Sequence, residues 1–277
     1  MGLRIATNVA SLNAQKHLMG NSLNLNRSFE RLSSGSRINR AADDAAGLAI
    51  SEQLRALIRG YRQADRNAND GVSLVQVAEG SLNEVSNMLI RLRELAVQGA
   101  SDTVGDTERK FIDVEYQQMK SEIQRITEST EFNGYNLLNG TGGVIDIQVG
   151  VHNDSFQDRI SFNASAANST LEALGLTGET VATKQSSQMS LDVVDNALTS
   201  VNAIRANFGA LQNRLVSTSQ NLKVADENYS AANSRIRDAD IAAETSELSR
   251  NQILQQAAIS VLAQANSTQN LALKLLQ

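Results

Sequence analysis

The sequence predicts a mainly α-helical protein, an elongated bundle of heptad-patterned helices or coiled coil with a small β-hairpin region at its tip. Three observations predict this fold class. Long stretches of the 277-residue chain repeat apolar residues at spacings of three and four, proline is absent, and aromatic residues make up only 4 %. Without proline, every residue keeps the backbone donor that a long helix needs. Few aromatic residues are expected where helices meet along narrow seams.

The N-terminal helix is expected to span about residues 5–33, with Gly35 ending it. Residues 5–26 carry one formal charge, Lys16, beside many Asn and Ser residues. An uncharged amide face next to an apolar stripe can be buried against copies of itself without leaving a bare charge. We therefore predict that this terminal helix packs against other copies of the chain during assembly.

Residues 34–44 form a connector, and the strongest periodic signal follows it. Positions stepped alternately by four and three from residue 50 to residue 96 are all apolar or Gly, which predicts one helix of about 70 Å. These positions are Ile50, Leu54, Leu57, Tyr61, Ala64, Ala68, Gly71, Val75, Ala78, Leu82, Val85, Leu89, Leu92 and Ala96.

Two more heptad seams predict two further helices. A short seam covers residues 112–126, and a longer one covers residues 194–236 with apolar residues spaced by seven. The longer seam contains Val194, Val201, Phe208, Leu215, Leu222, Tyr229 and Ile236. Three amphipathic helices of this kind can bury their seams on one another in a bundle.

Near residues 143–163 the apolar period changes to two, which predicts a β-hairpin. The alternating apolar residues are Ile145, Ile147, Val149, Ile160 and Phe162. Two Asn-Gly turn signals, at residues 133–134 and 139–140, precede this hairpin. Residues 163–188 are small and polar, and we expect a loop there with a short helical turn at residues 171–174.

The C-terminal helix is expected to start near Asp240 and to run almost to the end of the chain. Residues 251–277 match the N-terminal helix in composition and also carry one formal charge, Lys274. The two terminal helices should therefore act together. Their predicted inter-subunit residues are Leu12, Leu18, Leu25, Leu32, Leu248, Ile259, Leu262, Leu273 and Leu276.

The residue types that carry enzymatic or metal chemistry form no motif. Neither His17 nor His152 has a second His or Cys nearby, and no phosphate-binding loop, HExxH or GxSxG pattern occurs. The absence of Cys excludes disulfides and thiolate metal sites. The acidic pair Asp43–Asp44 suits a helix cap or a solvated surface. We expect no enzyme activity, no cofactor and no metal.

Charge and hydropathy exclude other classes of partner. The net charge is −5, and the basic and acidic residues are interspersed, so no nucleic-acid-binding patch is expected. No run of 18 apolar residues occurs, so no membrane span is expected. The N-terminus also lacks the continuous apolar core of a cleaved signal peptide.

Several long strings, in order along essentially the whole chain, resemble bacterial flagellin. They are ERLSSGSRIN at 30–39, DDAAGLAI at 43–50, RNANDGVSLVQVAEGSLNEV at 66–85, RLRELAVQ at 91–98, FNGYNLLNG at 132–140 and SRIRDADIAAETSELSRNQILQQAAISVLAQAN at 234–266. Only residues 163–188 stand where many flagellins insert variable outer domains. The chain is therefore similar to a short flagellin that lacks those domains.

The resemblance implies a structural subunit of the bacterial flagellar filament, which self-assembles into a helical tubular polymer for swimming motility. Residues 1–44 with 237–277 would form the inner core domain and its connector, and residues 45–236 would form a rod domain. We expect the terminal helices to become ordered on polymerisation, because their apolar stripes are not buried in a lone chain. The alternative is a hook–filament junction (hook-associated) protein, which shares the terminal helix pattern but acts in few copies.

The resemblance also implies partners and a location. The chain would polymerise with itself and would meet a flagellin export chaperone on its C-terminal helix, the type III export apparatus, and hook-associated and cap proteins. It would be extracellular, in the flagellum, without a cleaved signal peptide. Arg91, Leu95 and Glu115 correspond to residues through which the vertebrate Toll-like flagellin receptor would recognise the monomer.

Overall fold

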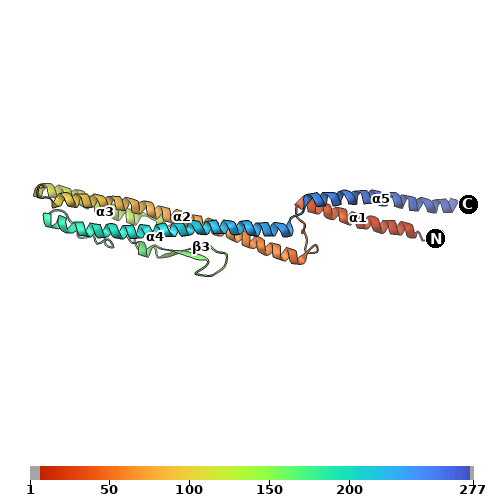
Figure 1. Ribbon diagram of the computed structural model, residues 1–277, viewed down its shortest axis with the longest axis horizontal. Helices are drawn as coiled ribbons and strands as arrows, with labels where there is room; N and C mark the ends of the chain where they lie inside the picture. Colours follow the sequence, from red (N-terminus) through yellow and green to blue (C-terminus); the bar gives the residue numbers. More distant parts are fainter. Residues whose placement is uncertain (1–6, 275–277) are drawn as a thin grey trace. The chain divides into compact units, whose positions relative to one another are not determined.

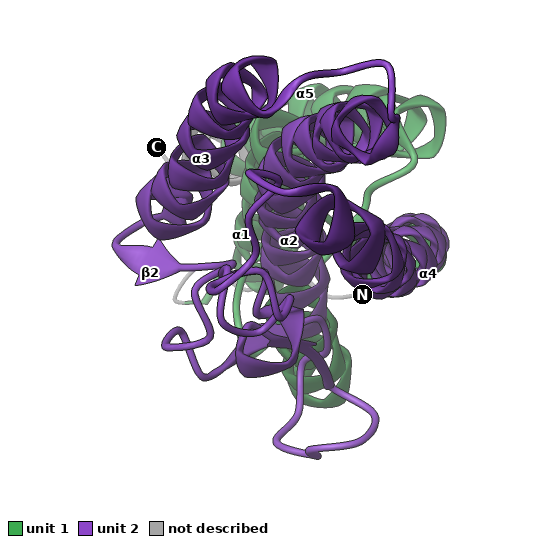
Figure 2. Cartoon of the chain, turned by 90° about the vertical axis from the view of Figure 1, so that its left-hand side faces the viewer, with its two compact units in different colours: residues 1–56, 228–277 green, residues 57–227 purple. Residues whose placement is uncertain are grey.

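The computed structural model describes residues 7–274, with side chains described as far as Thr268. The chain divides into two compact units, residues 1–56 with 228–277 and residues 57–227 (Figure 2). The helices are α1 (Val9–Ser34), α2 (Ala45–Ala100), α3 (Asp106–Ser129), α4 (Lys184–Arg237) and α5 (Ile241–Lys274) (Figure 1). The short elements are β1 (Glu131–Phe132), β2 (Tyr135–Asn136), β3 (Val144–Gln148), β4 (Arg159–Asn163) and the 3₁₀ turn η1 (Ser165–Ala167).

The core of residues 57–227 lies where α2, α3 and α4 run alongside one another (Figure 1). The heptad seam predicted for α2 is buried from Ala64 to Ala96, while Ile50 at its start is half exposed. The seam of α4 is buried from Val194 to Leu222. The predicted mainly α-helical fold with a β-hairpin is confirmed. Heptad periodicity identified the packed faces of α2 and α4.

Two antiparallel hairpins lie between α3 and α4. The predicted hairpin is β3–β4, with Ile147 opposite Ile160. The predicted position of this hairpin, at the tip of the bundle, is wrong. The amide of Asn67, in α2, donates to the Gln148 carbonyl at 2.9 Å, so the hairpin lies along α2, well before the helix end at Ala100. Glycines in α2 leave room for this close approach, and periodicity does not reveal such an approach.

The hairpin β1–β2 was not predicted as a pair of strands, although its turn was. Asn133 and Gly134 both have positive φ, 51° and 80°. These values are typical of the two central residues of a type I′ turn, which Asn-Gly favours. Each strand contains two residues. Strands this short show no alternation of apolar residues, so only the turn signal marks them.

The segment predicted as an irregular loop at 163–188 is packed onto the helices. Leu174, Leu176 and Val181 are buried. Helix α4 begins at Lys184, inside the predicted loop. Thr183 Oγ1 accepts from the Ser186 amide at 3.2 Å and Ser186 Oγ accepts from the Thr183 amide at 3.1 Å. This reciprocal cap satisfies backbone donors at the helix start, and it explains why the helix begins before its apolar seam.

In the other unit, α1 and α5 begin and end at capping residues. Helix α1 begins at Val9, after the predicted start, because Asn8 Oδ1 accepts from the Ser11 amide at 3.0 Å. Gly35 has a φ of 67° and ends α1 as predicted. Asp240 Oδ1 accepts from the Ala242 amide at 2.9 Å and starts α5 as predicted. The finer domain boundaries at 44/45 and 236/237 stay a prediction.

Candidate functional site

The two terminal helices, α1 and α5, lie side by side and antiparallel. The Asn8 side-chain amide, at the start of α1, donates to the Ala265 carbonyl in α5 at 3.0 Å. Near the other end of the pair, Arg31 Nη1 lies 3.6 Å from Glu244 Oε2. Residues more than two hundred positions apart in the chain therefore form one two-helix element. Its surface is the strongest candidate for a functional site.

The seam between α1 and α5 is built mainly from small and amide side chains. Residues at spacings of three and four lie on it, and they are buried or half-buried. On α1 they are Ser11, Ala14, Leu18, Asn21, Leu25, Ser28 and Leu32, and on α5 they are Glu244, Leu248, Asn251, Gln255, Ala258, Leu262 and Ala265. Five of the fourteen are large and apolar, all of them Leu and all half-buried, while most of the others are Ser, Ala, Asn or Gln. The pair therefore covers only part of its apolar surface within one chain.

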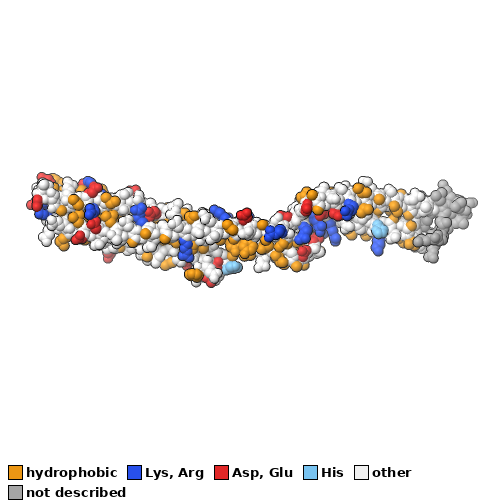
Figure 3. All heavy atoms as spheres, in the orientation of Figure 1, with side chains coloured by type: hydrophobic (Ala, Val, Ile, Leu, Met, Phe, Trp, Pro, Cys, Tyr) orange, Lys and Arg blue, Asp and Glu red, His pale blue; other side chains and the backbone are white. Residues whose placement is uncertain are grey.

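Large apolar side chains of the same two helices point outward. Those exposed on α1 and α5 are Val9, Leu12, Met19, Leu23, Phe29, Ile241, Ile253, Leu254, Ile259 and Val261. Met19 is 70 % exposed and Ile253 is 66 % exposed, although both residue types are usually buried. On the face drawn in Figure 3, the region of α1 and α5 is mostly hydrophobic or uncharged. An apolar surface of this kind marks an interaction site.

The predicted inter-subunit residues fall into three groups. Leu12 and Ile259 are exposed on the outer faces, 57 % and 52 %. The second group is half-buried on the seam within the chain and consists of Leu18, Leu25, Leu32, Leu248 and Leu262. Leu276 and the side chain of Leu273 lie outside the described residues.

Sequence reasoning missed most of the outward apolar side chains. Val9, Met19 and Phe29 in α1, and Ile253 and Val261 in α5, lie beside the predicted stripe rather than on it. The available signal was the presence of apolar residues on more than one side of each helix. A helix that is apolar on several sides is typically buried on several sides.

Backbone hydrogen bonds join the connector after α1 to the residues just before α5. The Arg37 amide donates to the Arg237 carbonyl at 2.6 Å, and the Ala239 amide donates to the Gly35 carbonyl at 2.9 Å. Ile38 is buried at 1 % exposure and anchors this crossing. The hydrogen bond from Arg237 also lowers the pKa of Glu52 below its usual value.

The predicted receptor residues lie in residues 57–227, and the structure brings two of them together. Arg91 Nη2 lies 2.7 Å from Glu115 Oε1, and Arg91 Nη1 lies 2.9 Å from Glu94 Oε2. The hydrogen bond with Glu115 raises the pKa of Arg91 most, and the hydrogen bond with Glu94 raises it further. Leu95 is buried, with 1 % of its surface exposed. Arg91 and Glu115 are therefore accessible, while Leu95 packs into the core.

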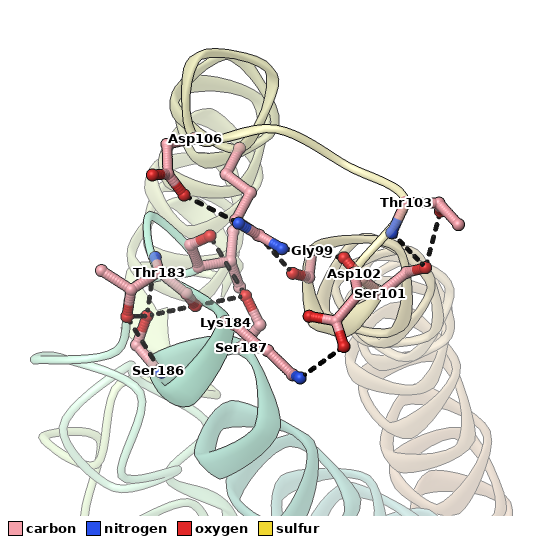
Figure 4. A network of polar contacts seen from close by, with 11 residues as sticks. Gly99, Ser101, Asp102, Thr103, Asp106, Thr183, Lys184, Ser186 and Ser187 are labelled. Carbon is pink, nitrogen blue, oxygen red and sulfur yellow. Dashed lines mark hydrogen bonds and ion pairs between the residues drawn. The ribbon is translucent and has the colours of Figure 1, made fainter.

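A second polar cluster closes the turn between α2 and α3 (Figure 4). Arg109 Nε donates to the Gly99 carbonyl at 2.9 Å, and Nη2 donates to the Ser101 carbonyl at 2.8 Å. The carbonyls at the end of a helix lack partners within it, so a buried guanidinium satisfies them. Lys184 Nζ lies 2.7 Å from Asp102 Oδ2 and ties the start of α4 to the same turn. We interpret this cluster as structural.

The described part of the chain offers little for metal or membrane chemistry. Across residues 7–274, no group of three His, Cys, Asp or Glu residues is placed to hold a metal ion. Within the same range, no helix combines the length and apolarity required to cross a bilayer.

Comparison with protein families identifies both halves of the chain. A family model described as the bacterial flagellin N-terminal helical region matches residues 5–142. A second, described as the bacterial flagellin C-terminal helical region, matches residues 191–276. The two matched regions include α1, α2, α3 and α5 in full and α4 from residue 191 onward.

Full-length relatives carry the same description. A flagellin of Halalkalibacterium halodurans is 45 % identical over 273 residues, 98 % of each chain. A flagellin of Bacillus subtilis is 40 % identical over 305 aligned positions, covering 99 % of this chain and 100 % of the relative. The relatives are therefore similar to this chain in both sequence and length.

Solved structures share the fold. The crystal structure of Bacillus cereus flagellin covers 57 % of this chain and 88 % of its own, at 31 % identity and a TM-score of 0.51. A Vibrio parahaemolyticus protein described as flagellar hook-associated covers 71 % of this chain at 15 % identity and a TM-score of 0.58. At that identity the second likeness concerns the fold alone.

Proposed function

This chain belongs to the bacterial flagellin family, whose members are structural subunits of the flagellar filament outside the cell, and we propose that α1 and α5 together lock each copy onto its neighbours. In this proposal residues 1–44 with 237–277 form the inner domain of the filament and residues 45–236 form the rod domain. The proposed role is structural and not enzymatic.

The outward apolar residues of α1 and α5 carry this proposal. Full burial of one large apolar side chain contributes about 1.5–3 kcal/mol. Ordering the backbone costs about 1–2 kcal/mol per residue. The seam between α1 and α5 contains mostly Ser, Ala, Asn and Gln, so burial within one chain offsets little of that cost. Docking against other copies covers the outer faces as well, and we propose that both helices become ordered at that step.

The geometry of the contact determines what kind of polymer forms. The exposed residues are spread over more than one side of α1 and α5, so one copy offers different surfaces to different neighbours. Contacts between unlike surfaces need not close into a ring and instead propagate into a helical polymer. We therefore propose a helical tube in which each added copy forms the template for the next.

Assembly of purified protein on filament seeds tests the proposal. The full chain and a chain lacking residues 251–277 are compared by electron microscopy after addition of seeds. The full chain should form long tubes and the shortened chain should form none, while circular dichroism shows that the shortened chain keeps helices. Tubes from the shortened chain would contradict the role of α5. A failure of both chains to form tubes would contradict self-assembly.

We also propose the route and partners that family membership implies. The chain would leave the cell through the type III export apparatus, without cleavage of a signal peptide. An export chaperone would cover residues 240–277, where the outward face of α5 includes Ile253, Leu254 and Ile259. Hook-associated and cap proteins would meet the ends of the polymer. Co-purification of a chaperone with the full chain, but not with the chain lacking residues 251–277, tests the second point.

A role in recognition by the vertebrate Toll-like flagellin receptor is a separate proposal. Arg91 and Glu115 support it because their side chains are 46 % and 43 % exposed and lie side by side. The buried Leu95 would act by holding the shape of this surface. A reporter-cell assay with pure monomer tests it, with Arg91→Ala as the variant and Arg125→Ala, in another exposed pair of α3, as the control. Absence of a response to the unmodified monomer would exclude the proposal.

A further inference from the structure

Gly80 lies in the interior of α2. No close contact with a described residue of the chain requires a glycine at this position. A glycine in a helix interior costs about 1 kcal/mol relative to alanine. The other four glycines of α2 lie under close neighbours: a Cβ at Gly47, Gly60, Gly71 or Gly99 would come within 3.0 Å of another side chain. A Cβ at Gly80 would meet nothing within 4 Å. The space above Gly80 is therefore free for another molecule.

That space is a groove of about 360 Å³ between α2 and the end of α3. It is lined by Val77, Gly80, Ser81 and Glu84 of α2 and by Ile126, Ser129, Thr130 and Glu131. Val77 is 41 % exposed and Ile126 is only partly buried, so the floor has an apolar part. The rim carries Glu84 and Glu131, neither of which forms an ion pair among the described residues. The groove suits an apolar side chain accompanied by a positive charge.

The loop between β3 and β4 presents those two features. Phe156 is 84 % exposed, the largest exposed fraction of any large apolar side chain among the described residues. The loop holds it in place, because Asp154 Oδ1 accepts from the Phe156 amide at 2.8 Å and from the Gln157 amide at 2.9 Å. A phenyl ring held on a tight loop loses little conformational freedom when it binds.

The loop also carries one positive charge that an acidic groove can receive, on Arg159. Asp154 is occupied by backbone amides of its own loop, and Asp158 Oδ2 accepts from the Asp154 amide at 3.0 Å. Among the described residues, Arg159 donates to the side-chain oxygens of Gln148 and Asn153. The loop carboxylates thus have local donors, while the guanidinium has no carboxylate partner in an ion pair within the described chain.

The loop of the same chain is too far away to fill the groove. Val151, at the start of the loop, lies against Gly60. Residues 60 and 80 of a continuous helix are about 30 Å apart. We propose that the Phe156 loop of one copy inserts into the Gly80 groove of a second copy. This contact rests on the proposed filament function and adds a side contact between residues 57–227 of neighbouring subunits.

Filling the groove tests the contact. Gly80→Leu places a side chain in the groove and favours the helix, so monomer melting, followed by circular dichroism, should be unchanged or higher. Seeded assembly should need a critical concentration at least about tenfold higher, because burial of a Phe side chain is worth roughly that factor or more. Gly209→Leu is the matched control, since a Cβ at Gly209, within α4, also meets nothing within 4 Å. Its critical concentration should not change.

The other side of the contact has its own variants. Phe156→Ser should raise the critical concentration by a similar factor, and Gln157→Ser in the same loop should not. The double variant of Gly80 and Phe156 should be no worse than the more affected single variant. Normal assembly of Gly80→Leu or of Phe156→Ser, with folded monomer, would overturn the proposal.

Cross-linking gives a second readout, since the chain has no native cysteine. Glu84→Cys copies mixed with Gln157→Cys copies should form disulfide-linked dimers in filaments after oxidation, whereas neither variant alone should do so. Absence of cross-links in filaments of the mixture would overturn the contact while leaving filament formation intact. Failure of the unmodified chain to polymerise would instead overturn the proposed function, and the contact with it.

Discussion

Asn8 and Ala265 are joined by a hydrogen bond in which the Asn8 side-chain amide donates to the Ala265 carbonyl at 3.0 Å. The side-chain oxygen of Asn8, Oδ1, meanwhile accepts from the Ser11 amide at 3.0 Å. One side chain therefore starts α1 and sets the register of α5 beside it. Because the leucines of the seam are only half-buried and most of its other residues are small or carry amides, this polar contact helps to determine the pairing.

The first prediction separates the two roles of Asn8. Asn8→Asp keeps an acceptor for the Ser11 amide but loses the donor and places a carboxylate beside the Ala265 carbonyl. We expect filaments of this variant to be less stable by about 1 kcal/mol or more per subunit. Their dissociation temperature, measured by light scattering, should fall. Asn8→Ser, which keeps a capping acceptor without the added charge, is the control. Equal dissociation temperatures for filaments of Asn8→Asp and of the unmodified chain would contradict the idea.

The second prediction concerns Leu262, which is half-buried on the seam of α5. Leu262→Asp should block polymerisation, since it would place an unpaired charge among covered side chains. Residues 57–227 should stay folded. Electron microscopy of seeded samples and circular dichroism of the monomer measure the two effects. Gln264→Asp, at an exposed position of the same helix, should assemble, and ordinary filaments from Leu262→Asp would refute the prediction.

The third prediction concerns Arg109, whose side chain is 8 % exposed. Arg109→Ala should lower the free energy of unfolding of residues 57–227 by about 2–4 kcal/mol, because the Gly99 and Ser101 carbonyls lose a charged donor. Urea unfolding of the full chain, followed at the helical signal, measures this. Arg125→Ala, in an exposed pair with Glu122, should cost less than about 1 kcal/mol. Similar losses from both variants would show that burial of Arg109 is unimportant.

The fourth prediction concerns pH and Tyr116, a fully buried residue whose hydroxyl forms no well-aligned hydrogen bond among the described residues. Burial raises the pKa of Tyr116 from 10.0 to about 12. The folded chain therefore keeps a proton that the unfolded chain loses. The contribution of Tyr116 to the free energy of unfolding is therefore fully present below pH 10. It is lost as the pH rises through about 12, and the loss is at most roughly 3 kcal/mol.

Tyr116→Phe tests this pH dependence. The variant should be about as stable as the unmodified chain at pH 7, since the buried hydroxyl that it removes has no well-aligned hydrogen bond among the described residues. It should lose less stability between pH 10 and pH 12, as followed by urea unfolding at each pH. Tyr135→Phe, at an exposed position, should leave the pH profile unchanged. Parallel profiles for Tyr116→Phe and the unmodified chain would rule out the assignment.

The fifth prediction concerns Gly71, where a Cβ would come 2.6 Å from Ile147 and 3.3 Å from Leu215. Gly71→Ala should destabilise the chain by about 1–3 kcal/mol, since overpacking outweighs the gain in helix propensity. Thermal melting measures this, and Gly80→Ala should have the opposite sign. A stabilised Gly71→Ala would indicate that the β3–β4 hairpin does not pack against α2 at this position.

The sequence alone determined the elements that depend on neighbouring residues. Heptad spacing identified the buried faces of α2, α3 and α4, because a helix places residues three and four apart on one face. Gly35 and Asp240 marked helix ends through local backbone and capping chemistry. Asn133–Gly134 marked a turn that needs positive φ. Each of these signals acts over a few residues, so the chain order suffices to read it.

The tertiary structure decided what those elements meet. Several sides of α1 and α5 are apolar, and only the pairing of helices distant in sequence shows that Leu262 lies on the seam while Met19 and Ile253 point outward. Arg109 looks like an ordinary surface charge until the α2–α3 turn encloses it. Gly71 and Gly80 look alike in sequence, yet one lies under the hairpin and the other under open space. Long-range contacts decide these outcomes, because burial depends on which surfaces the whole fold brings together.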